Sequence, residues 1–413
     1  MKRVVIIGAG ASGLISSIFA RKNKNDVTVL EKNEICGKKI LMTGNGRCNF
    51  WNEDQNLVHY RSNNFEKIEK ILNKNNQIKI LDFFKKIGIE PKIKNGYYYP
   101  YSNQAVSIQQ ALILEAQKQG VKIRNKSNVI DVKKNKNEFE IFLENGEKIK
   151  SDVVIIATGS KAIPKTGSDG LGYELCRKFN HSIIKPLPAL VQLKTGGKFL
   201  KEWAGIRADV SIGLIENNKK IAEEKGEIQL TNYGISGICV FNLSGRVSRG
   251  LEENKKEKVQ INFLKGLNIK TLDEFIIWLD NRDEVMKNRT IYQLLEGVLN
   301  YKLVNVLLKL SKVRSQDKWK DIDNNLKIAI AKNIVSLELD IIGTNSFEQC
   351  QVCSGGVPLC EINEYTMESK KENGLYIIGE VLDVDGDCGG YNLEWAWITG
   401  MVSGTNIQIT DKL

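Results

Sequence analysis

The sequence predicts an α/β protein whose core is a Rossmann-type parallel sheet, interrupted by a long insertion. One observation is a strand–turn–helix–strand pattern within residues 2–31, with glycines in its turn. The other is that continuous apolar runs, typical of parallel strands buried on both faces, return only at residues 151–160 and 374–380. Distant parts of the chain are therefore expected to form one sheet, with the insertion between the last two strands.

The first pattern has the spacing of a dinucleotide-binding turn. An apolar strand leads into GAGASG (residues 8–13), which is followed by a helical segment and a second strand that ends at Glu31. Gly8 permits the tight turn, Gly10 lets the backbone approach a pyrophosphate, and Gly13 lets the helix lie against the strand. The helix N-terminus offers free N–H groups to the phosphates. Glu31 is placed to accept hydrogen bonds from an adenosine ribose, which disfavours a 2′-phosphate.

The segments between these strands predict further layers. Residues 120–152 alternate apolar and polar side chains around an ENG turn, which indicates a strand followed by an antiparallel meander on the parallel sheet. After Pro188, strand-like runs (ALVQLK, ADVSIGLI, GEIQL, ICVFNLS, KVQINFL) continue to residue 265, as in a small barrel or sandwich. Residues 271–337 are expected to be helical, because TLDE at their start is a capping box and leucines follow at helical spacing.

Two more glycine-rich segments are expected to complete a site for a long dinucleotide that carries a flavin. GLYIIGE ends at Glu380, whose carboxylate suits ribityl hydroxyls, and an acidic loop then leads through the glycines at 389–390 into the last helix. The free N–H groups of that helix suit the N1–O2 edge of a flavin, where negative charge collects on reduction. The loop of residues 37–49 (GKKILMTGNGRCN) suits the pyrophosphate and the dimethylbenzene side, with Lys39 or Arg47 neutralising phosphate charge.

Composition limits the alternatives. The net charge of +11 permits RNA binding without establishing it, because residues 191–349 hold 25 Lys+Arg against 21 Asp+Glu and no RGG tract or basic tail is present. Cys350 and Cys353 form half of a zinc-type pattern, and with only two histidines in the chain no metal is predicted. The eight cysteines lack a disulfide framework, and no apolar run reaches the ~20 residues of a membrane helix. A cytoplasmic protein without a membrane partner is expected.

The sequence resembles the BaiN/YhiN-like flavoprotein family, described as NAD(P)/FAD-dependent oxidoreductases and in part as aminoacetone oxidases. The resemblance covers the whole chain and is carried by GAGASG with Glu31, KKILMTGNGRCN, IIATGSKAIPKTGSDGLGY, GEIQLTNYGISG, SGGVPL and TMESKKENGLYIIGEVLDVDGDCGGYNLEWAW. It implies an FAD-binding Rossmann domain of the glutathione-reductase type (1–188 and 350–413). A β-barrel insert (189–268 and 338–349) interrupts this domain and itself carries a helical subdomain (269–337).

The resemblance and the glycine-rich segments together give the expected FAD site, in which the cofactor is bound noncovalently. The expected cofactor-binding residues are Gly8, Gly10, Ala11, Ser12, Gly13, Glu31, Lys32, Gly37, Lys38, Lys39, Thr43, Gly44, Gly46, Arg47, Cys48, Asn49, Val129, Ala157, Thr158, Gly159, Gly379, Glu380, Asp385, Gly389, Gly390, Tyr391, Asn392 and Leu393.

The resemblance also implies the activity. Reduced FAD is expected to deliver hydride to an activated C=C bond of a substrate bound between the FAD domain and the insert. Family members have been linked to a steroid enone and to a uracil of large-subunit ribosomal RNA, so a flavoenzyme that forms dihydrouridine in rRNA is the alternative. A redox-sensing flavin-binding protein is a second alternative. No second glycine-rich nucleotide-binding unit is apparent, so NAD(P)H is expected, if at all, as a transient electron donor. The sequence leaves the oligomeric state open.

The proton donor is expected to differ from that of the relatives. Asn232 and Ile238 stand where the family usually has His and Pro. The candidates are therefore Cys48, Tyr233, Tyr391 or a bound water. Cys48 is the first choice, because its loop should lie beside the flavin and Arg47 should lower the pKa of its thiol. A structural role for Cys48 is equally open.

Overall fold

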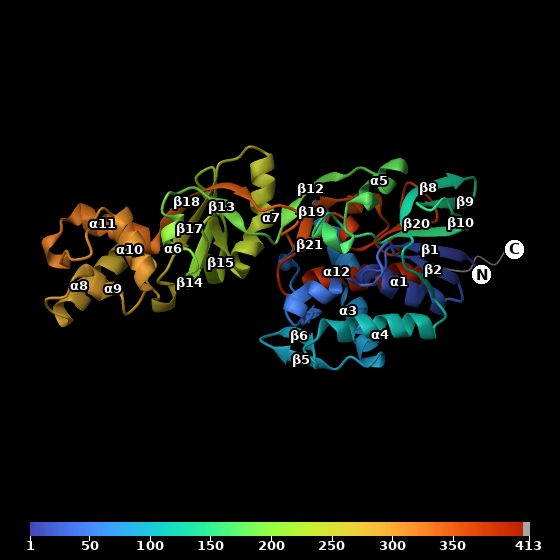
Figure 1. Ribbon diagram of the computed structural model, residues 1–413, viewed down its shortest axis with the longest axis horizontal. Helices are drawn as coiled ribbons and strands as arrows, with labels where there is room; N and C mark the ends of the chain where they lie inside the picture. Colours follow the sequence, from blue (N-terminus) through green and yellow to red (C-terminus); the bar gives the residue numbers. More distant parts are fainter. Residues whose placement is uncertain (408–413) are drawn as a thin grey trace. The chain divides into compact units, whose positions relative to one another are not determined.

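The computed structural model describes residues 1–407 and divides into two compact units (Figure 1). Unit 1 comprises Met1–Leu187 and the chain from Gln351 onward, and unit 2 comprises Pro188–Cys350. Each unit has an apolar core of its own. Residues 408–413, which end the predicted FAD-binding domain, lie outside the described residues. The predicted class, a Rossmann-type α/β domain interrupted by a barrel, is confirmed.

Unit 1 is built on a five-stranded parallel sheet of order β20-β11-β1-β2-β7. Its register aligns Ile7 with both Leu30 and Ile156, and Ile156 with Ile377, so these strands finish at one edge. This is the carboxyl edge, where open α/β sheets bind ligands. The strands are β1 (Arg3–Ile7), β2 (Asp26–Leu30), β7 (Lys122–Arg124), β11 (Val153–Ile156) and β20 (Leu375–Ile377).

Helices cover one face of this sheet and the predicted meander lies on the other (Figure 1). Helix α1 (Ala11–Lys22) packs closely against α12 (Tyr391–Asn406): a Cβ at Gly400 would lie 2.5 Å from the backbone oxygen of Ser12, and one at Gly404 equally close to that of Ser16. The meander is β8 (Val129–Asn135), β9 (Glu138–Leu143) and β10 (Lys148–Ser151). The first helix of the chain is thus held by the last.

Shorter elements complete unit 1. The helices are α2 (Phe65–Ile71), α3 (Lys74–Lys86), α4 (Ala105–Lys118), α5 (Leu171–Lys178) and the 3-10 segments η1 (Ile40–Gly46), η2 (Leu57–His59), η3 (Pro164–Thr166), η6 (Leu359–Glu361) and η7 (Gly379–Val381). The strands are β3 (Trp51–Asn52), β4 (Tyr60–Arg61), β5 (Pro91–Lys94), β6 (Tyr97–Pro100), β12 (Ile184–Ala189), β19 (Val352–Gly356) and β21 (Asp385–Gly386).

Unit 2 is a closed barrel of order β13-β16-β15-β14-β17-β18, with a group of helices at one end (Figure 1). The strands are β13 (Leu193–Thr195), β14 (Arg207–Glu216), β15 (Lys219–Leu230), β16 (Gly234–Ser236), β17 (Glu257–Asn262) and β18 (Leu337–Thr344). The α-helices are α6 (Leu200–Trp203), α7 (Ile238–Glu252), α8 (Leu272–Val285), α9 (Ile291–Leu295), α10 (Tyr301–Leu310) and α11 (Asn324–Val335). The capping box predicted at Thr271 is confirmed at the start of α8.

One element of unit 2 was predicted wrongly. The run ICVFNLS was expected to be a strand, but it begins helix α7 (Ile238–Glu252). Its buried side chains Cys239, Val240, Leu243 and Val247 follow a helical spacing, and the helix packs against the barrel strands β14 to β18. A short run of apolar and β-branched residues cannot be assigned by periodicity alone, and here tertiary packing decided.

Candidate functional site

The glycine turn after β1 leaves room for a ligand at the N-terminus of α1. Gly8 has φ +105°, and a Cβ at Gly13 would lie 2.0 Å from the backbone oxygen of Gly8, so the fold itself requires both glycines. Gly10 differs: it has φ −81°, and a Cβ there would meet no atom within 4 Å. The protein's own packing therefore does not explain Gly10. An open space beside free helix N–H groups fits a phosphate.

Glu31 lies buried beside this turn. One carboxylate oxygen accepts a hydrogen bond from the Ala9 N–H at 2.9 Å, and the other accepts from the backbone and side-chain nitrogens of Asn33 at 2.8 and 2.7 Å. These bonds fix the carboxylate at the end of β2. Lys32, the next residue, forms an ion pair with Asp169 at 2.6 Å. The loop after β11 therefore lies beside the end of β2.

Glu380 joins three predicted segments. Its carboxylate accepts hydrogen bonds from Lys39 Nζ at 3.0 Å, from Ser160 Oγ at 2.7 Å and from the Cys353 N–H at 3.2 Å. The preceding Gly379 lies against the glycine turn, since a Cβ there would approach Ser12 Oγ to 2.6 Å. Sequence reasoning missed Ser160, although its place directly after a central strand is the signal that could have revealed it.

The loop of residues 37–49 follows the same edge. The Gly37 N–H donates to the Ala9 carbonyl at 2.8 Å, and Gly44, Asn45, Gly46 and Cys48 adopt left-handed conformations. Among residues 1–407, the buried side-chain oxygens of Asn49 and Tyr173 have no hydrogen-bond partner. Buried polar atoms of this kind are normally paired. Both therefore suit a polar ligand.

The other predicted residues of this region lie at or near the same edge. Lys38 Nζ donates to the backbone oxygen of Lys165 at 2.9 Å, and Thr43 Oγ1 donates to that of Ile40 at 2.6 Å. Val129 begins β8, and Ala157, Thr158 and Gly159 follow β11 directly.

Cys48 does not have the properties expected of it. The side chain is 0% exposed, and burial raises the pKa of its thiol to about 12. The Arg47 guanidinium instead lies 5.6 Å from the Tyr99 ring centre, and its Nε donates to the Gly44 carbonyl at 3.3 Å. The expectation that Arg47 lowers the pKa of Cys48 is wrong, because desolvation of the thiol dominates.

The start of α12 is shaped by two left-handed glycines. Gly389 has φ +141° and Gly390 has φ +101°, and a Cβ at Gly390 would lie within 3.0 Å of the Trp51 backbone. Asn392 fastens the turn: its side chain accepts from the Gly386 N–H at 2.9 Å and donates to the Gly386 carbonyl at 2.8 Å. Leu393 packs on the core, and the buried Asp385 belongs to β21, which pairs with β4. The first turn of α12 is thus held rigidly.

A titratable network that the sequence did not predict surrounds this turn. The His59 ring stacks on Tyr391 with centroids 4.5 Å apart, and its two nitrogens lie 3.0 Å from carboxylate oxygens of Asp54 and Asp387. Burial opposes the charged ring, but the hydrogen bonds to both carboxylates raise the pKa of His59 above its usual value. Burial also raises the pKa of Tyr391.

The structure places Tyr233 in unit 2, on the turn before β16, where it is 37% exposed. Asn232, which precedes it, is exposed as well. All the predicted cofactor-binding residues lie in unit 1, whereas Tyr233 belongs to unit 2.

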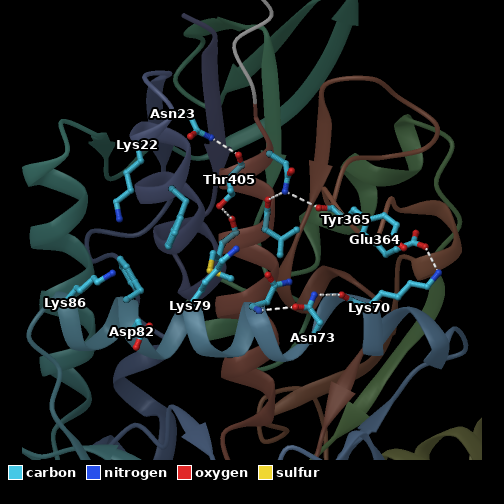
Figure 2. A pocket seen from close by; sticks show the side chains of 16 residues that line it. Lys22, Asn23, Lys70, Asn73, Lys79, Asp82, Lys86, Glu364, Tyr365 and Thr405 are labelled. Atoms are coloured by element: carbon cyan, nitrogen blue, oxygen red, sulfur yellow. Dashed lines mark hydrogen bonds and ion pairs between the residues drawn. The ribbon is translucent and has the colours of Figure 1, made fainter.

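A cavity of about 620 Å³ lies elsewhere on unit 1, between α1, α3 and α12 (Figure 2). Lys22, Lys70, Lys79 and Lys86 contribute to its lining, and it contains none of the predicted cofactor residues. Lys70 forms an ion pair with Glu364 at 3.1 Å. Within residues 1–407 no cluster of three His, Cys, Asp or Glu side chains is placed to hold a metal ion. None of the helices in that range has the length and apolar character needed to cross a bilayer.

Comparison with known proteins identifies the family. The model of the HI0933-like protein Rossmann domain matches residues 2–406. The chain is 38% identical to a 3-dehydro-bile acid delta(4,6)-reductase of Clostridium scindens, over 98% of both chains. It is 29% identical to a ribosomal RNA dihydrouridine synthase of Escherichia coli, over 95% of this chain and 94% of that one. Among solved structures, a 3-ketosteroid-delta4-(5alpha)-dehydrogenase of Rhodococcus jostii aligns with TM-score 0.47 and 11% identity, over 98% and 97% of the two chains. The predicted family resemblance is confirmed: the chain belongs to the HI0933-like Rossmann-domain family.

Proposed function

We propose that the protein reduces an activated C=C bond, conjugated to a carbonyl group, in a small molecule of the steroid-enone type. The observation that supports this most directly is the 38% identity, over 98% of both chains, to a 3-dehydro-bile acid delta(4,6)-reductase. Bound FAD supplies hydride transfer, and the protein supplies position and electrostatics. Lys39, Glu31 and the glycine turn would hold the cofactor, and the N-terminus of α12 would stabilise negative charge on a reduced flavin ring.

Reduction of a C=C bond also requires a proton on the carbon next to the one that receives hydride. Tyr391 and Tyr233 are our candidates for the group that donates it. Tyr391 follows the glycine turn of α12 directly, and Tyr233 lies in the TNYGISG segment of unit 2. Cys48 is better suited to a structural role, because its thiol is fully buried and has a raised pKa.

The enone proposal is tested with the flavin already reduced. The purified holoprotein is reduced anaerobically and mixed with a steroid acid that carries the 3-oxo-4,6-diene, and flavin absorbance is followed. We expect rapid reoxidation of the flavin with loss of one C=C bond, and no reoxidation by the saturated 3-oxo steroid. Equal rates with both compounds, or none with either, would contradict the proposal.

NAD(P)H is proposed as a transient electron donor. Only one glycine-rich nucleotide turn is present, so the nicotinamide must reach the flavin without a second nucleotide-binding domain of its own. Anaerobic mixing with NADH or NADPH should bleach the flavin. A flavin that stays oxidised with both, but is reduced by dithionite, indicates another physiological donor.

A second candidate substrate is a uridine of ribosomal RNA. It is favoured by the 29% identity to a ribosomal RNA dihydrouridine synthase over 95% of the chain, and the net charge of +11 is compatible with it. This function predicts salt-sensitive binding to rRNA. It also predicts that one dihydrouridine disappears from the rRNA of a deletion strain and returns when the gene is restored. An unchanged nucleoside profile would exclude it.

A further inference from the structure

The first turn of α12 contains a buried carboxylate that neither the cofactor assignment nor the proposed reaction uses. Glu394 is 1% exposed, and its backbone N–H donates to the Gly390 carbonyl at 2.9 Å. Its carboxylate accepts hydrogen bonds from Tyr60 Oη at 3.0 Å and from the side-chain nitrogens of Gln55 and Gln77 at 3.3 Å. All three donors are neutral. An ionised carboxylate in such a site is only partly compensated.

The charges around Glu394 can be stated element by element. The titratable groups that face it are Tyr60 from β4 and Tyr391 from its own helix, whereas α3 and the loop after β3 contribute only the two glutamines. No lysine or arginine within residues 1–407 forms an ion pair with it. Burial raises the pKa of Glu394 to about 7, so the carboxyl group can gain or lose a proton near neutral pH.

Hydrogen bonds connect this carboxylate to the glycine turn that begins the helix. Tyr60 Oη lies 3.2 Å from the Tyr391 carbonyl as well as 3.0 Å from Glu394. Gln55 donates to the Asn52 carbonyl at 2.6 Å, and the Asn52 side chain donates to the Gly389 carbonyl at 2.9 Å. The helix N-terminus predicted to face the flavin therefore shares one rigid network with Glu394.

A negative charge that arrives at the N-terminus of α12 must coexist with Glu394 in the same turn. Like charges in a poorly solvated region disfavour each other's ionised state. At an effective dielectric constant of about 20, a charge at about 10 Å changes a carboxyl pKa by about one unit. A rise of this size would move the pKa of Glu394 from about 7 to above neutral pH. Gln55 and Gln77, which donate to the carboxylate, are only half-buried and so contact solvent. Only these side chains therefore separate the carboxyl group from water.

We propose that Glu394 is a proton-exchanging residue of the flavin site. It binds one proton from solvent when two electrons enter the cofactor, its carboxylate becoming a carboxylic acid, and it releases that proton when the electrons leave to the substrate. Glu394 acts through the hydrogen bonds of Tyr60 and the glycine turn, so it is a positioning residue that touches neither the cofactor nor the substrate. The inference rests on FAD being the cofactor, and it does not depend on which C=C bond is reduced.

The test is the pH dependence of the flavin midpoint potential, measured in the holoprotein without substrate. Each proton taken up with two electrons adds about 30 mV per pH unit to the slope. Near pH 7–8 we expect the wild type to take up more protons per two electrons than Glu394→Gln, by up to one proton. Glu364→Gln is the matched control, because hydrogen bonding to Lys67 lowers the pKa of Glu364 to about 2 and keeps it ionised throughout.

Identical slopes for the wild type and Glu394→Gln would overturn the proposal. Tyr60→Phe provides a second test should Glu394→Gln fold poorly. It removes a hydrogen bond that favours the ionised carboxylate, so the pH range of the extra proton should move upward. An unmoved range would also count against the inference. Because no substrate is present, failure of enone reduction leaves this result unaffected.

Discussion

Replacement of Gly10 by alanine separates what the fold needs from what the cofactor needs. The backbone at Gly10 has φ −81° and ψ −165°, which an alanine adopts without strain. The added Cβ would meet no protein atom within 4 Å. The free energy of unfolding of the apoprotein should therefore change by no more than about 0.5 kcal/mol.

The same methyl group would occupy the space at the N-terminus of α1 into which a pyrophosphate must come. Loss of even one close phosphate contact there should weaken FAD binding at least tenfold, which corresponds to about 1.4 kcal/mol. Gly13→Ala is the matched variant. Its Cβ would lie 2.0 Å from the Gly8 backbone oxygen, so it should destabilise the apoprotein itself by about 1–3 kcal/mol.

The assay combines urea unfolding of apoprotein with titration of FAD by quenching of its fluorescence. We expect Gly10→Ala to unfold with the wild-type midpoint and to bind FAD at least tenfold more weakly. Wild-type FAD affinity in Gly10→Ala would refute the placement of the pyrophosphate. A marked loss of apoprotein stability in Gly10→Ala would refute the claim that the fold leaves this position open.

Three further changes have defined outcomes. Burial raises the pKa of Glu257 to about 7, so between about pH 5 and 7 the native state binds more protons than the unfolded state. The free energy of unfolding of the wild type therefore decreases as the pH rises through this range. Relative to the wild type, Glu257→Gln should therefore gain about 1–3 kcal/mol between pH 5 and pH 8 in urea unfolding, whereas a constant difference would show that Glu257 does not titrate. Lys39→Met leaves the Glu380 carboxylate without its cation and should weaken FAD binding about tenfold at low salt, with little effect on apoprotein unfolding; unchanged FAD affinity would remove Lys39 from the site. Cys48→Ser places a hydroxyl in a fully buried position and should cost about 1–3 kcal/mol of stability without shifting the pH profile of activity, and a shifted profile would restore Cys48 as a proton donor.

The parts of the fold that follow from local pattern were predictable. The β1–α1–β2 unit has a glycine spacing and an apolar pattern that determine its geometry, and Thr271 begins a helix because its capping box satisfies local N–H groups. ICVFNLS was assigned wrongly because its short apolar pattern suits a strand as well as a helix. Packing against the barrel, which resolves the ambiguity, is a long-range property.

The glycines of the site were predictable where the local backbone leaves no room for a side chain, as at Gly8 and Gly13. It was not predictable where function depends on partners distant in sequence. Glu394 meets Tyr60 across 334 residues, and no local pattern marks either as part of a network. The thiol of Cys48 was misjudged for the same reason, because its pKa depends on a burial that sequence neighbours do not reveal.

The contact of α1 with α12 also determines when during biosynthesis the cofactor can be bound. Gly13 leaves the ribosome long before Gly400, which packs against its neighbour Ser12. At translation rates of about 5–20 residues per second, roughly 20–80 s separate the two. The whole of unit 2 is synthesised within that interval. We therefore expect nascent chains arrested before Tyr391 to remain colourless, and flavin uptake to be a late, essentially post-translational event.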